Sequence, residues 1–319
     1  MKLNSILEQV QDNHIIYESF EKADKILNHS GYQNIAVSVS GGADSDLMID
    51  ICEKVGAKVR YVFFNTGIEY QATLEHLDWL ENKYGIKIER IMAPVPVPLG
   101  VKKYGQPFLS KFVSEAIGSL QRHGFEFRDD CEGDYPIGYL KWWNNEHCHE
   151  GFKSSQFDVN FNKDLKPFLM ENPPQFQISK RCCDGAKKNA SKHYIKENNI
   201  DLILLGIRKA EGGIRSTQYK SCFVTKSGIH QYMPIFWYTN KDKEAYEQIF
   251  NIQHSRCYTE YGLKRTGCCG CPYNKDFESD LEIIKQYEPK LYKAVNNIFH
   301  DSYEYTRLYN EYCKQHDTK

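Results

Sequence analysis

The string Ser40-Gly41-Gly42-Ala43-Asp44-Ser45 stands between an apolar run at 35–39 and a helical pattern that begins at 44. A strand that turns through two glycines into a helix forms an anion cradle, because backbone without Cβ atoms can approach a phosphate closely. The free N–H groups of the first helical turn point at the negative charge, and Ser40 and Ser45 add hydroxyls. The string therefore predicts a site for a nucleotide phosphate. A tight turn capped by Ser and Asp explains the glycines but not the whole string.

Asp44 adds a further constraint, because its carboxylate would repel a bare phosphate. A divalent cation between the carboxylate and the pyrophosphate removes this repulsion. We therefore expect Mg²⁺ to accompany the nucleotide at residues 40–45.

The surrounding pattern alternates strands with helices, which favours a doubly wound, mostly parallel sheet. The expected strands are 35–39, 58–65, 86–92 and 201–205, and the expected helices are 44–55, 70–84 and 184–197. The stretch 59–64 is almost continuously apolar, as expected for a strand that helices cover on both faces. Ligands of such sheets lie beyond the carboxyl ends of the strands, so the loop 65–69 should lie beside the first loop.

The regular pattern stops after Ala93, where Pro94, Pro96 and Pro98 break it. We interpret about 94–180 as an insertion or lid, with a helix at 107–122. A hairpin joining 222–225 to 230–233 and a helix at 240–252 follow. We thus expect a nucleotide-binding α/β domain over 1–275, interrupted by the insertion, and a C-terminal helical extension over 276–319. The tyrosine-rich pattern of this extension predicts helix packing rather than base stacking.

Composition excludes several classes of protein. The 319 residues are 41% hydrophobic and 26% charged, and the formal net charge is -1. No overall field should recruit nucleic acid or an anionic membrane. No stretch approaches the roughly 18 continuous apolar residues of a membrane span, and the first ten residues do not resemble a leader. We expect a cytoplasmic globular protein without a membrane partner.

Eleven cysteines are too many to serve only as packing residues, and disulfides are not expected in a reducing compartment. Cys182 and Cys183 are adjacent just before a predicted helix, and Cys268 and Cys271 lie in a loop about ninety residues later. Two groups of thiolates that are distant in sequence can build one soft metal site. We predict that these four cysteines are metal ligands.

The metal depends on geometry. Adjacent cysteines strain around one zinc ion, whereas each thiolate of a cubane binds a different iron atom, so the pair Cys182-Cys183 favours a 4Fe-4S cluster. Zinc and a metal-free redox pair stay open as alternatives. Cys269 is surplus to a four-ligand site and either replaces Cys268 or remains a thiol.

Ser-Gly-Gly-x-Asp-Ser resembles the signature of the PP-loop ATP pyrophosphatases, an adenine nucleotide alpha hydrolase-like superfamily. The resemblance implies a parallel α/β sheet of the HUP type that binds ATP or an adenylyl compound. It also implies cleavage of the α–β phosphate bond, which leaves AMP on an acceptor.

Further segments resemble the phosphoadenylyl-sulfate (PAPS/APS) reductase family within that superfamily. A Cys-Cys pair followed by Gly-Cys-x-x-Cys is similar to the cluster pattern of its adenylyl-sulfate reductases. Thr66-Gly67-Ile68-Glu69 resembles the family's Thr-Gly-x-Glu loop, and 206–215 resembles its Gly-x-Arg-x-x-Glu-Ser-x-x-Arg segment, with Gly212 in place of the serine. The nucleotide-binding residues that these matches imply are Ser40, Gly41, Gly42, Asp44, Ser45, Thr66, Glu69 and Gly206.

Arg208 and Arg215 of the same segment are the candidates to neutralise phosphate charge, because one guanidinium group can bind two phosphate oxygens in a bidentate manner. Together with Asp44 they form the predicted catalytic set. Pairing of either arginine with Glu211 is the structural alternative.

Two departures from the family direct the functional prediction. The reductases end in Glu-Cys-Gly-Leu-His, whose cysteine attacks sulfur, but this chain has Glu311-Tyr312-Cys313-Lys314-Gln315-His316. The reductases also tend to lose the full Ser-Gly-Gly-x-Asp-Ser string, which is intact here. The resemblance thus implies an enzyme in which adenylation by ATP is coupled to sulfur transfer, next to a 4Fe-4S cluster that relays sulfur or supplies electrons.

Two alternatives stay open. One is a thiol-dependent reductase of adenylyl sulfate or phosphoadenylyl sulfate, with Cys313 as nucleophile. The other is a non-catalytic module that senses nucleotide or redox state. Adenine nucleotide is the expected partner, with a nucleic acid or a sulfur-donor protein as further candidates. The sequence leaves the acceptor and the oligomeric state open.

Overall fold

The computed structural model describes residues 3–129, 133–147, 157–212, 218–226 and 228–317. The chain divides into two compact units. The first comprises Met1–Ala93 and Lys187–Gly267, and the second comprises Pro94–Ala186 and Cys268–Lys319. The stretch interpreted as an insertion, the cysteine loop and the C-terminal helices therefore share one unit.

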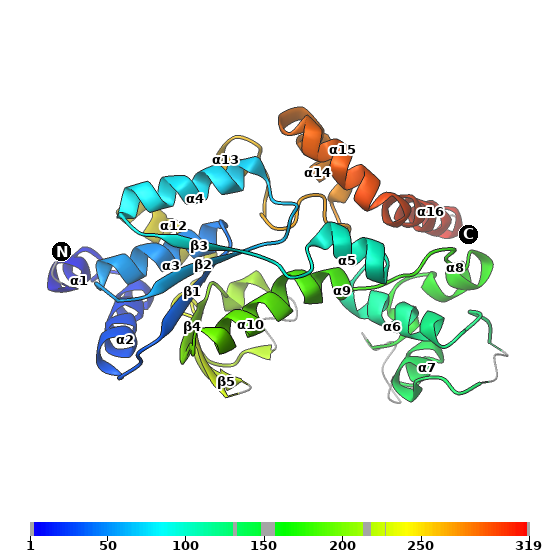
Figure 1. The fold of residues 1–319 in the computed structure, drawn as a ribbon, viewed down its shortest axis with the longest axis horizontal. Coiled ribbons are helices and arrows are strands. Elements are labelled where there is room, and N and C mark those ends of the chain that lie inside the picture. Colours follow the sequence, from blue (N-terminus) through cyan, green and yellow to red (C-terminus); the bar gives the residue numbers. More distant parts are fainter. Residues whose placement is uncertain (1–2, 130–132, 148–156, 213–217, 227, 318–319) are drawn as a thin grey trace. The chain divides into compact units, whose positions relative to one another are not determined.

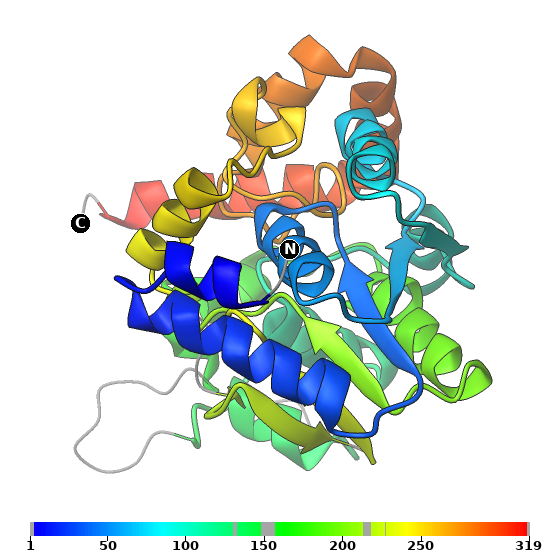
Figure 2. The same cartoon turned by 90° about the vertical axis from the view of Figure 1, so that its left-hand side faces the viewer.

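The first unit is built on a six-stranded sheet with the order β3-β2-β1-β4-β6-β5 (Figures 1 and 2). Its strands are β1 (Ile35–Val39), β2 (Arg60–Asn65), β3 (Ile88–Met92), β4 (Leu202–Leu205), β5 (Phe223–Lys226) and β6 (Ile229–Tyr232). All neighbouring pairs are parallel except β5 and β6, which form an antiparallel hairpin. The predicted mostly parallel sheet is confirmed.

Helices cover both faces of this sheet. They are α1 (Leu3–Gln9), α2 (His14–His29), α3 (Ala43–Lys54), α4 (Gln71–Tyr84), α10 (Ala190–Glu197), α12 (Asn240–Ile249) and α13 (Arg256–Thr259), with a 3₁₀ turn, η3 (Lys209–Glu211). Val37 and Val39 pack in the core formed with α2, α3 and α4, whereas Ala36 packs on the other face with Tyr194 of α10. This alternation follows from the period of two along a strand, and it makes the fold doubly wound.

The register of the strands fixes where their loops emerge. Val39 of β1 is opposite Phe63 of β2, and Ser38 is opposite Leu205 of β4. The strands run parallel and end nearly level, so the loops after β1, β2 and β4 leave the same edge of the sheet. Ligand sites of open α/β sheets lie at this edge.

The second unit is helical in the ranges described. Its elements are α5 (Val97–Tyr104), α6 (Lys111–Arg122), α7 (Ile137–Trp143), η1 (Val159–Phe161), α8 (Leu165–Glu171), α9 (Arg181–Cys183), α14 (Phe277–Tyr287), α15 (Pro289–Ile298) and α16 (His300–Asp317), and a π-helical turn, η2 (Asp184–Asn189), follows α9. Tyr305, Tyr309 and Tyr312 of α16 pack in one core with Phe108 and Phe168. The predicted packing role of these three tyrosines is confirmed.

The expectation that the prolines after Ala93 break regular structure is wrong at α5. Pro96 is the N-cap of this helix and Pro98 is in its first turn. Proline is tolerated there because the first N–H groups of a helix have no intrahelical partner. The helix expected at 107–122 is present as α6, which begins at Lys111 after the N-cap Ser110.

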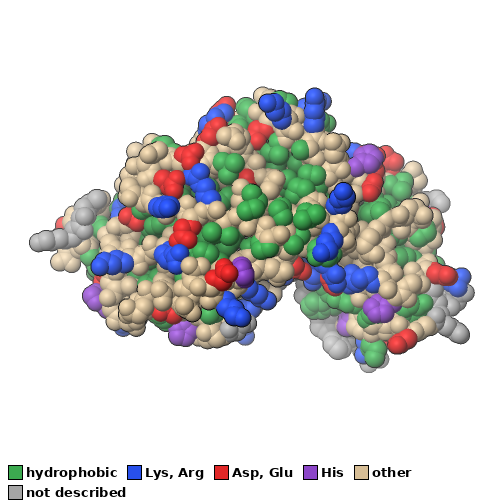
Figure 3. Space-filling view, viewed as in Figure 1, with side chains coloured by type: hydrophobic (Ala, Val, Ile, Leu, Met, Phe, Trp, Pro, Cys, Tyr) green, Lys and Arg blue, Asp and Glu red, His purple; other side chains and the backbone are tan. Residues whose placement is uncertain are grey.

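Surface charge agrees with the near-zero net charge. On the face drawn in Figure 3, acidic and basic side chains are interspersed over the first unit. Within the described ranges, no helix combines the length and the apolar composition needed to cross a bilayer.

Candidate functional site

Helix α3 begins directly after the two glycines that follow β1. Gly42 is its N-cap residue, and Gly41 has a φ of +68°. The Gly42 N–H donates to Ser40 Oγ at 3.3 Å, and Ser45 Oγ donates to the Gly42 carbonyl oxygen at 2.7 Å. These bonds fix the turn against the positive end of the α3 dipole. We call residues 40–45 the cradle.

The glycines of the cradle are closely surrounded. A Cβ on Gly41 would lie 2.5 Å from Thr73 Cγ2, so a side chain there requires Thr73 to move. A Cβ on Gly42 would lie 3.0 Å from Thr266 Oγ1 and 3.1 Å from Tyr258 Oη. Hydroxyls therefore line the space that a side chain at Gly42 would enter.

Asp44 and Arg208, both predicted as catalytic, lie together. Arg208 Nε donates to the two carboxylate oxygens of Asp44 at 3.0 and 3.1 Å, and Arg208 Nη1 donates to Asn240 Oδ1 at 3.0 Å. Arg208 is 8% exposed, so water screens this ion pair only weakly. The sequence offered Glu211 as the structural partner of Arg208, but the structure pairs Arg208 with Asp44.

The loop after β2 is closed by its own side chains. The N–H and the hydroxyl of Thr66 both donate to Glu69 Oε1, at 2.9 and 2.6 Å, and the Gly67 N–H donates to Asn65 Oδ1 at 2.8 Å. Thr66 is buried. These bonds hold Glu69 at the carboxyl edge of the sheet, and its role toward ribose or metal stays a prediction.

Gly206, at the end of β4, lies close to the start of α3. A Cβ there would lie 3.1 Å from Met48 Cε and 3.5 Å from the Asp44 carbonyl atoms. The loop that carries Arg208 therefore approaches the cradle closely.

A segment that sequence reasoning missed also contacts the cradle. Tyr258 Oη accepts a hydrogen bond from the Ala43 N–H at 3.3 Å and lies 3.1 Å from Thr266 Oγ1. Ser255 Oγ donates to the Ala72 carbonyl oxygen at 3.0 Å, which ties α13 to α4. No local pattern marks Tyr258, because its contact with Ala43 joins residues 215 positions apart.

Beneath the cradle, Asp46 of α3 is buried among charged groups. It contacts His76 Nε2 at 3.0 Å and His254 Nδ1 at 2.7 Å, and His254 Nε2 contacts Glu247 Oε1 at 2.8 Å. Burial alone would lower the pKa of His254, but its hydrogen bonds and charge interactions with Asp46 and Glu247 raise it to about 9. A charged imidazolium therefore bridges α3 and α12 at neutral pH.

The four cysteines predicted as metal ligands all belong to the second unit. Cys182 and Cys183 are on α9, Cys268 and Cys271 precede α14, and all four are thiols rather than disulfides. A hydrogen bond with Cys183, burial, and the charges of Cys183, Cys271 and Cys268 all raise the pKa of Cys182. The two segments thus bring their thiols near one another, and we call these four residues the cysteine cluster.

Two other residues lie near this cluster. Cys269 is fully buried, and Tyr303 Oη donates to the carbonyl oxygen of Gly270 between Cys269 and Cys271. The charge of Cys268 is among those that raise the pKa of Cys182. The four-ligand set with Cys268 stays our prediction.

Tyr273 brings a polar group to the cluster. Burial raises its pKa, nearby Ser114 lowers it, and the charges of three cluster cysteines raise it further. The Ser114 hydroxyl already donates to the Phe108 carbonyl oxygen at 2.8 Å and accepts from the Phe108 N–H. Within the described residues, the buried Tyr273 hydroxyl has no hydrogen-bond partner.

The described part of the chain contains no group of three or more His, Cys, Asp or Glu side chains arranged to hold a metal ion. Ligands of a 4Fe-4S core bind different iron atoms and so stand further apart than those of one zinc ion. Sulfur atoms of such a core also accept hydrogen bonds, which suits the Tyr273 hydroxyl. The thiols of the four cysteines and the Tyr273 hydroxyl are donor types that a 4Fe-4S group uses, and both this group and the zinc alternative stay predictions.

The remaining predicted residues have different outcomes. Arg215 lies outside the described residues. Cys313 is within α16 and not on a loose tail, and its Sγ donates to the Lys163 carbonyl oxygen at 3.6 Å.

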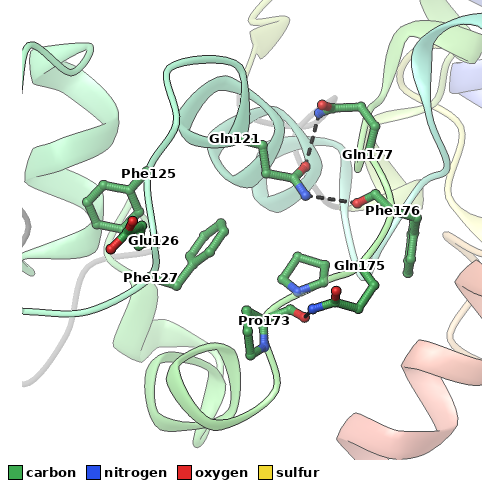
Figure 4. Close-up of a pocket in the computed structure, with 9 residues that line it drawn as sticks. Gln121, Phe125, Glu126, Phe127, Pro173, Gln175, Phe176 and Gln177 are labelled. Atoms are coloured by element: carbon green, nitrogen blue, oxygen red, sulfur yellow. Dashed lines mark hydrogen bonds between the residues drawn. The ribbon is translucent and has the colours of Figure 1, made fainter.

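A cavity of about 400 Å³ lies in the second unit (Figure 4). Gln121 lies at its wall, where Nε2 donates to the Phe176 carbonyl oxygen at 2.8 Å and Oε1 accepts from Gln177 Nε2 at 3.0 Å. None of the predicted site residues lines this cavity.

Comparison with known proteins places the chain in a family. The model of the phosphoadenosine phosphosulfate reductase domain matches residues 34–110 and 101–274. These ranges include the cradle, the loops after β2 and β4, and the cysteine cluster. The chain belongs to the phosphoadenosine phosphosulfate reductase domain family.

Individual relatives are distant. An uncharacterised protein of Methanocaldococcus jannaschii is 24% identical over 282 residues, which are 86% of this chain, and the chain spans only 43% of that protein. A phosphoadenosine 5′-phosphosulfate reductase of Buchnera aphidicola is 22% identical over 200 residues, covering 63% of this chain and 76% of the reductase. A crystal structure of the phosphoadenylyl-sulfate reductase from Candida auris in a phosphate complex matches with a TM-score of 0.45 and 12% identity, over 82% of this chain and 93% of that one.

Proposed function

We propose that this chain uses ATP to adenylate an acceptor oxygen, which a sulfur nucleophile then displaces. In the first step the acceptor oxygen bonds to the α-phosphorus and the α–β bridging bond breaks, so that pyrophosphate leaves. In the second step sulfur bonds to the acceptor carbon, the carbon–oxygen bond breaks, and AMP leaves. The observation that carries this proposal is the complete cradle at the start of α3, where Gly41 has a φ of +68° and the hydroxyl oxygens of Thr266 and Tyr258 lie 3.0 and 3.1 Å from the place that a Cβ on Gly42 would take.

The residues of the cradle would act on the phosphates. N–H groups at the start of α3 and the hydroxyls of Ser40 and Ser45 would donate to phosphate oxygens. Asp44 would hold Mg²⁺, which would neutralise the pyrophosphate charge. Arg208 would exchange its bonds to Asp44 for bonds to the phosphate, because a guanidinium forms bidentate hydrogen bonds with either group.

The loops around the cradle would complete the nucleotide site. We assign Thr66, Glu69 and Gly206 to the nucleotide, because the loops that carry them leave the same edge of the sheet as the cradle. Arg215 is a second candidate for the phosphate charge. The cysteine cluster would hold a 4Fe-4S group, which would relay sulfur or supply electrons, with zinc as the alternative.

A second candidate function is reduction of adenylyl sulfate or phosphoadenylyl sulfate. Membership of the reductase domain family and the relative in Buchnera favour it. Here the Cys313 thiolate would bond to the sulfur of the sulfonucleotide, and the sulfur–oxygen bond would break. AMP would leave from adenylyl sulfate, or adenosine 3′,5′-bisphosphate from phosphoadenylyl sulfate, and a second thiol would then release sulfite. Cys313 lies within α16, where its Sγ donates to the Lys163 carbonyl oxygen at 3.6 Å, so this role would require that contact to break.

Product analysis distinguishes these functions. Anaerobically purified protein is incubated with Mg²⁺ and ATP, with and without total nucleic acid as acceptor, and in parallel with adenylyl sulfate and a thiol. We expect pyrophosphate and AMP from ATP and no sulfite. Sulfite that disappears in Cys313→Ser would support the reductase instead. Tight binding of ATP without any product over hours would indicate a sensing module.

Metal analysis tests the cofactor separately. Iron, sulfide and zinc are measured on the same preparation, together with its ultraviolet-visible spectrum. We expect about four iron and four sulfide per chain for one cubane. One zinc and no iron would contradict the sulfur relay.

A further inference from the structure

Two N–H groups of the cradle donate to hydroxyls of the chain. The Gly42 N–H donates to Ser40 Oγ, and the Ala43 N–H donates to Tyr258 Oη at 3.3 Å. A hydroxyl that accepts from an N–H also carries a proton of its own, so it can act as a donor toward an anion at the same place. Ser40 belongs to the signature string, but Tyr258 comes from a distant segment.

Contacts of Tyr258 and of the residues just before it fix the position of its side chain. Its Oη lies 3.1 Å from Thr266 Oγ1, and Ser255 anchors the start of its helix on α4. His254, four positions earlier, is fixed between Asp46 and Glu247. These contacts make the position of the Tyr258 hydroxyl at the α3 N-terminus a built feature of the first unit.

The Thr266 hydroxyl also lies at the N-terminus of α3, next to that of Tyr258. A Cβ on Gly42 would lie 3.0 Å from Thr266 Oγ1, so its hydroxyl faces the same small space as Tyr258 Oη. Both residues are only partly buried.

We propose that Tyr258 and Thr266 form the second wall of the cradle and donate their hydroxyl protons to phosphate oxygens of a nucleoside polyphosphate. This inference rests on the proposed function, because it names further ligands of the same nucleotide. When a phosphate oxygen accepts from the Ala43 N–H, the Tyr258 hydroxyl rotates about its C–O bond and donates to the phosphate. Burial raises the pKa of Tyr258, so the phenol keeps the proton that it donates.

The inference also concerns specificity. Donors on two walls suit a group with several charged oxygens, and a neutral nucleoside would gain nothing from them. Loss of one hydroxyl should therefore weaken the binding of ATP and of inorganic pyrophosphate, and leave the binding of adenosine unchanged.

The test measures the dissociation constants of ATP with Mg²⁺, of pyrophosphate and of adenosine for the full chain and three variants. Tyr258→Phe and Thr266→Val each remove one hydroxyl. Tyr84→Phe is the matched control, because the Tyr84 hydroxyl donates to Asp50 further along α3 at 2.9 Å. Thermal unfolding of each variant shows whether it folds.

We expect Tyr258→Phe to weaken ATP and pyrophosphate about tenfold or more, and Thr266→Val less, because each removes a hydrogen bond to a charged acceptor. Tyr84→Phe should bind like the wild type. Equal affinities of wild type and both hydroxyl variants would overturn the inference and leave the proposed function intact. A wild-type chain that binds neither ATP nor pyrophosphate would overturn both.

Discussion

The cradle and the cysteine cluster satisfy their polar groups in different ways. In the cradle, N–H groups donate to hydroxyls of the chain, and the Asp44 carboxylate faces Arg208. In the cysteine cluster, burial and neighbouring thiols raise the pKa of Cys182, and within the described ranges the Tyr273 hydroxyl has no partner. The cradle is thus stabilised by its own hydrogen bonds, whereas thiolates of the cluster would be stabilised by a bound cationic group.

The largest expected effect concerns the cysteine cluster. Cys182→Ser should abolish iron binding, because serine does not replace a buried thiolate at a soft metal. Iron and sulfide content and the visible spectrum of anaerobic protein measure the effect. Cys313→Ser is the control and should keep the full iron content. An unchanged iron content in Cys182→Ser would show that Cys182 is not an iron ligand.

The second effect tests the charge balance of the cradle. Arg208→Ala should lower the rate of pyrophosphate release from ATP by about 100-fold or more, because it removes the cation that would stabilise the developing phosphate charge. Arg208→Lys keeps the charge but not the planar donor group, so its rate should lie between those of the wild type and Arg208→Ala. An Arg208→Ala rate within a factor of two of the wild type would show that Arg208 only balances Asp44.

A third prediction concerns the ion bridge beneath the cradle. The pKa of His254 is raised to about 9 in the folded chain, against about 6.5 in an unfolded one. Its proton therefore stabilises the fold fully below about pH 6.5, and this stabilisation declines as the pH rises and is lost above about pH 9.

The free energy of unfolding, measured from pH 6 to pH 10, tests this dependence. Between these limits the wild type should lose up to about 3 kcal/mol more than His254→Gln. His193→Gln is the control, because His193 pairs with Glu197 on the surface and is largely exposed. Parallel pH profiles of the wild type and His254→Gln would contradict the bridge.

The smallest predicted effect concerns Gly→Ala substitutions, which distinguish the cost of a positive φ from the cost of a steric clash in the cradle. Gly41 and Gly56 have nearly the same φ, +68° and +67°, but a Cβ on Gly41 would strike Thr73 and one on Gly56 would meet nothing within 4 Å. Gly56→Ala should lower the unfolding free energy by about 1 kcal/mol, and Gly41→Ala by about 2–3 kcal/mol. Equal losses of unfolding free energy in the two variants, measured by denaturant titration, would show that Thr73 moves aside for the new methyl group at little cost.

Much of the first unit could be predicted because its signals are local. The apolar run at 35–39, the glycines and the helical pattern after them lie within twenty residues, and they indicate β1, the cradle and α3 directly. The loop after β2 followed from the rule that ligand loops share one edge of a parallel sheet.

Other features could not be predicted because they depend on distant contacts. Pairing of Asp44 with Arg208 joins residues 164 positions apart, and Tyr258 reaches Ala43 across 215 positions. The sequence also separated the stretch 94–180 from the C-terminal helices, although they share the core around Phe168. Aromatic residues alone do not indicate which distant aromatic residues they contact.

Calorimetric titration of the wild type and Gly42→Ala with ATP and Mg²⁺ tests whether the cradle binds the nucleotide. An alanine Cβ would lie 3.0 Å from Thr266 Oγ1 and 3.1 Å from Tyr258 Oη, on the side of the two hydroxyls where phosphate oxygens are expected. We expect one ATP per wild-type chain and at least about tenfold weaker binding to a folded Gly42→Ala chain. Equal affinities for the two proteins would contradict a nucleotide site in the cradle.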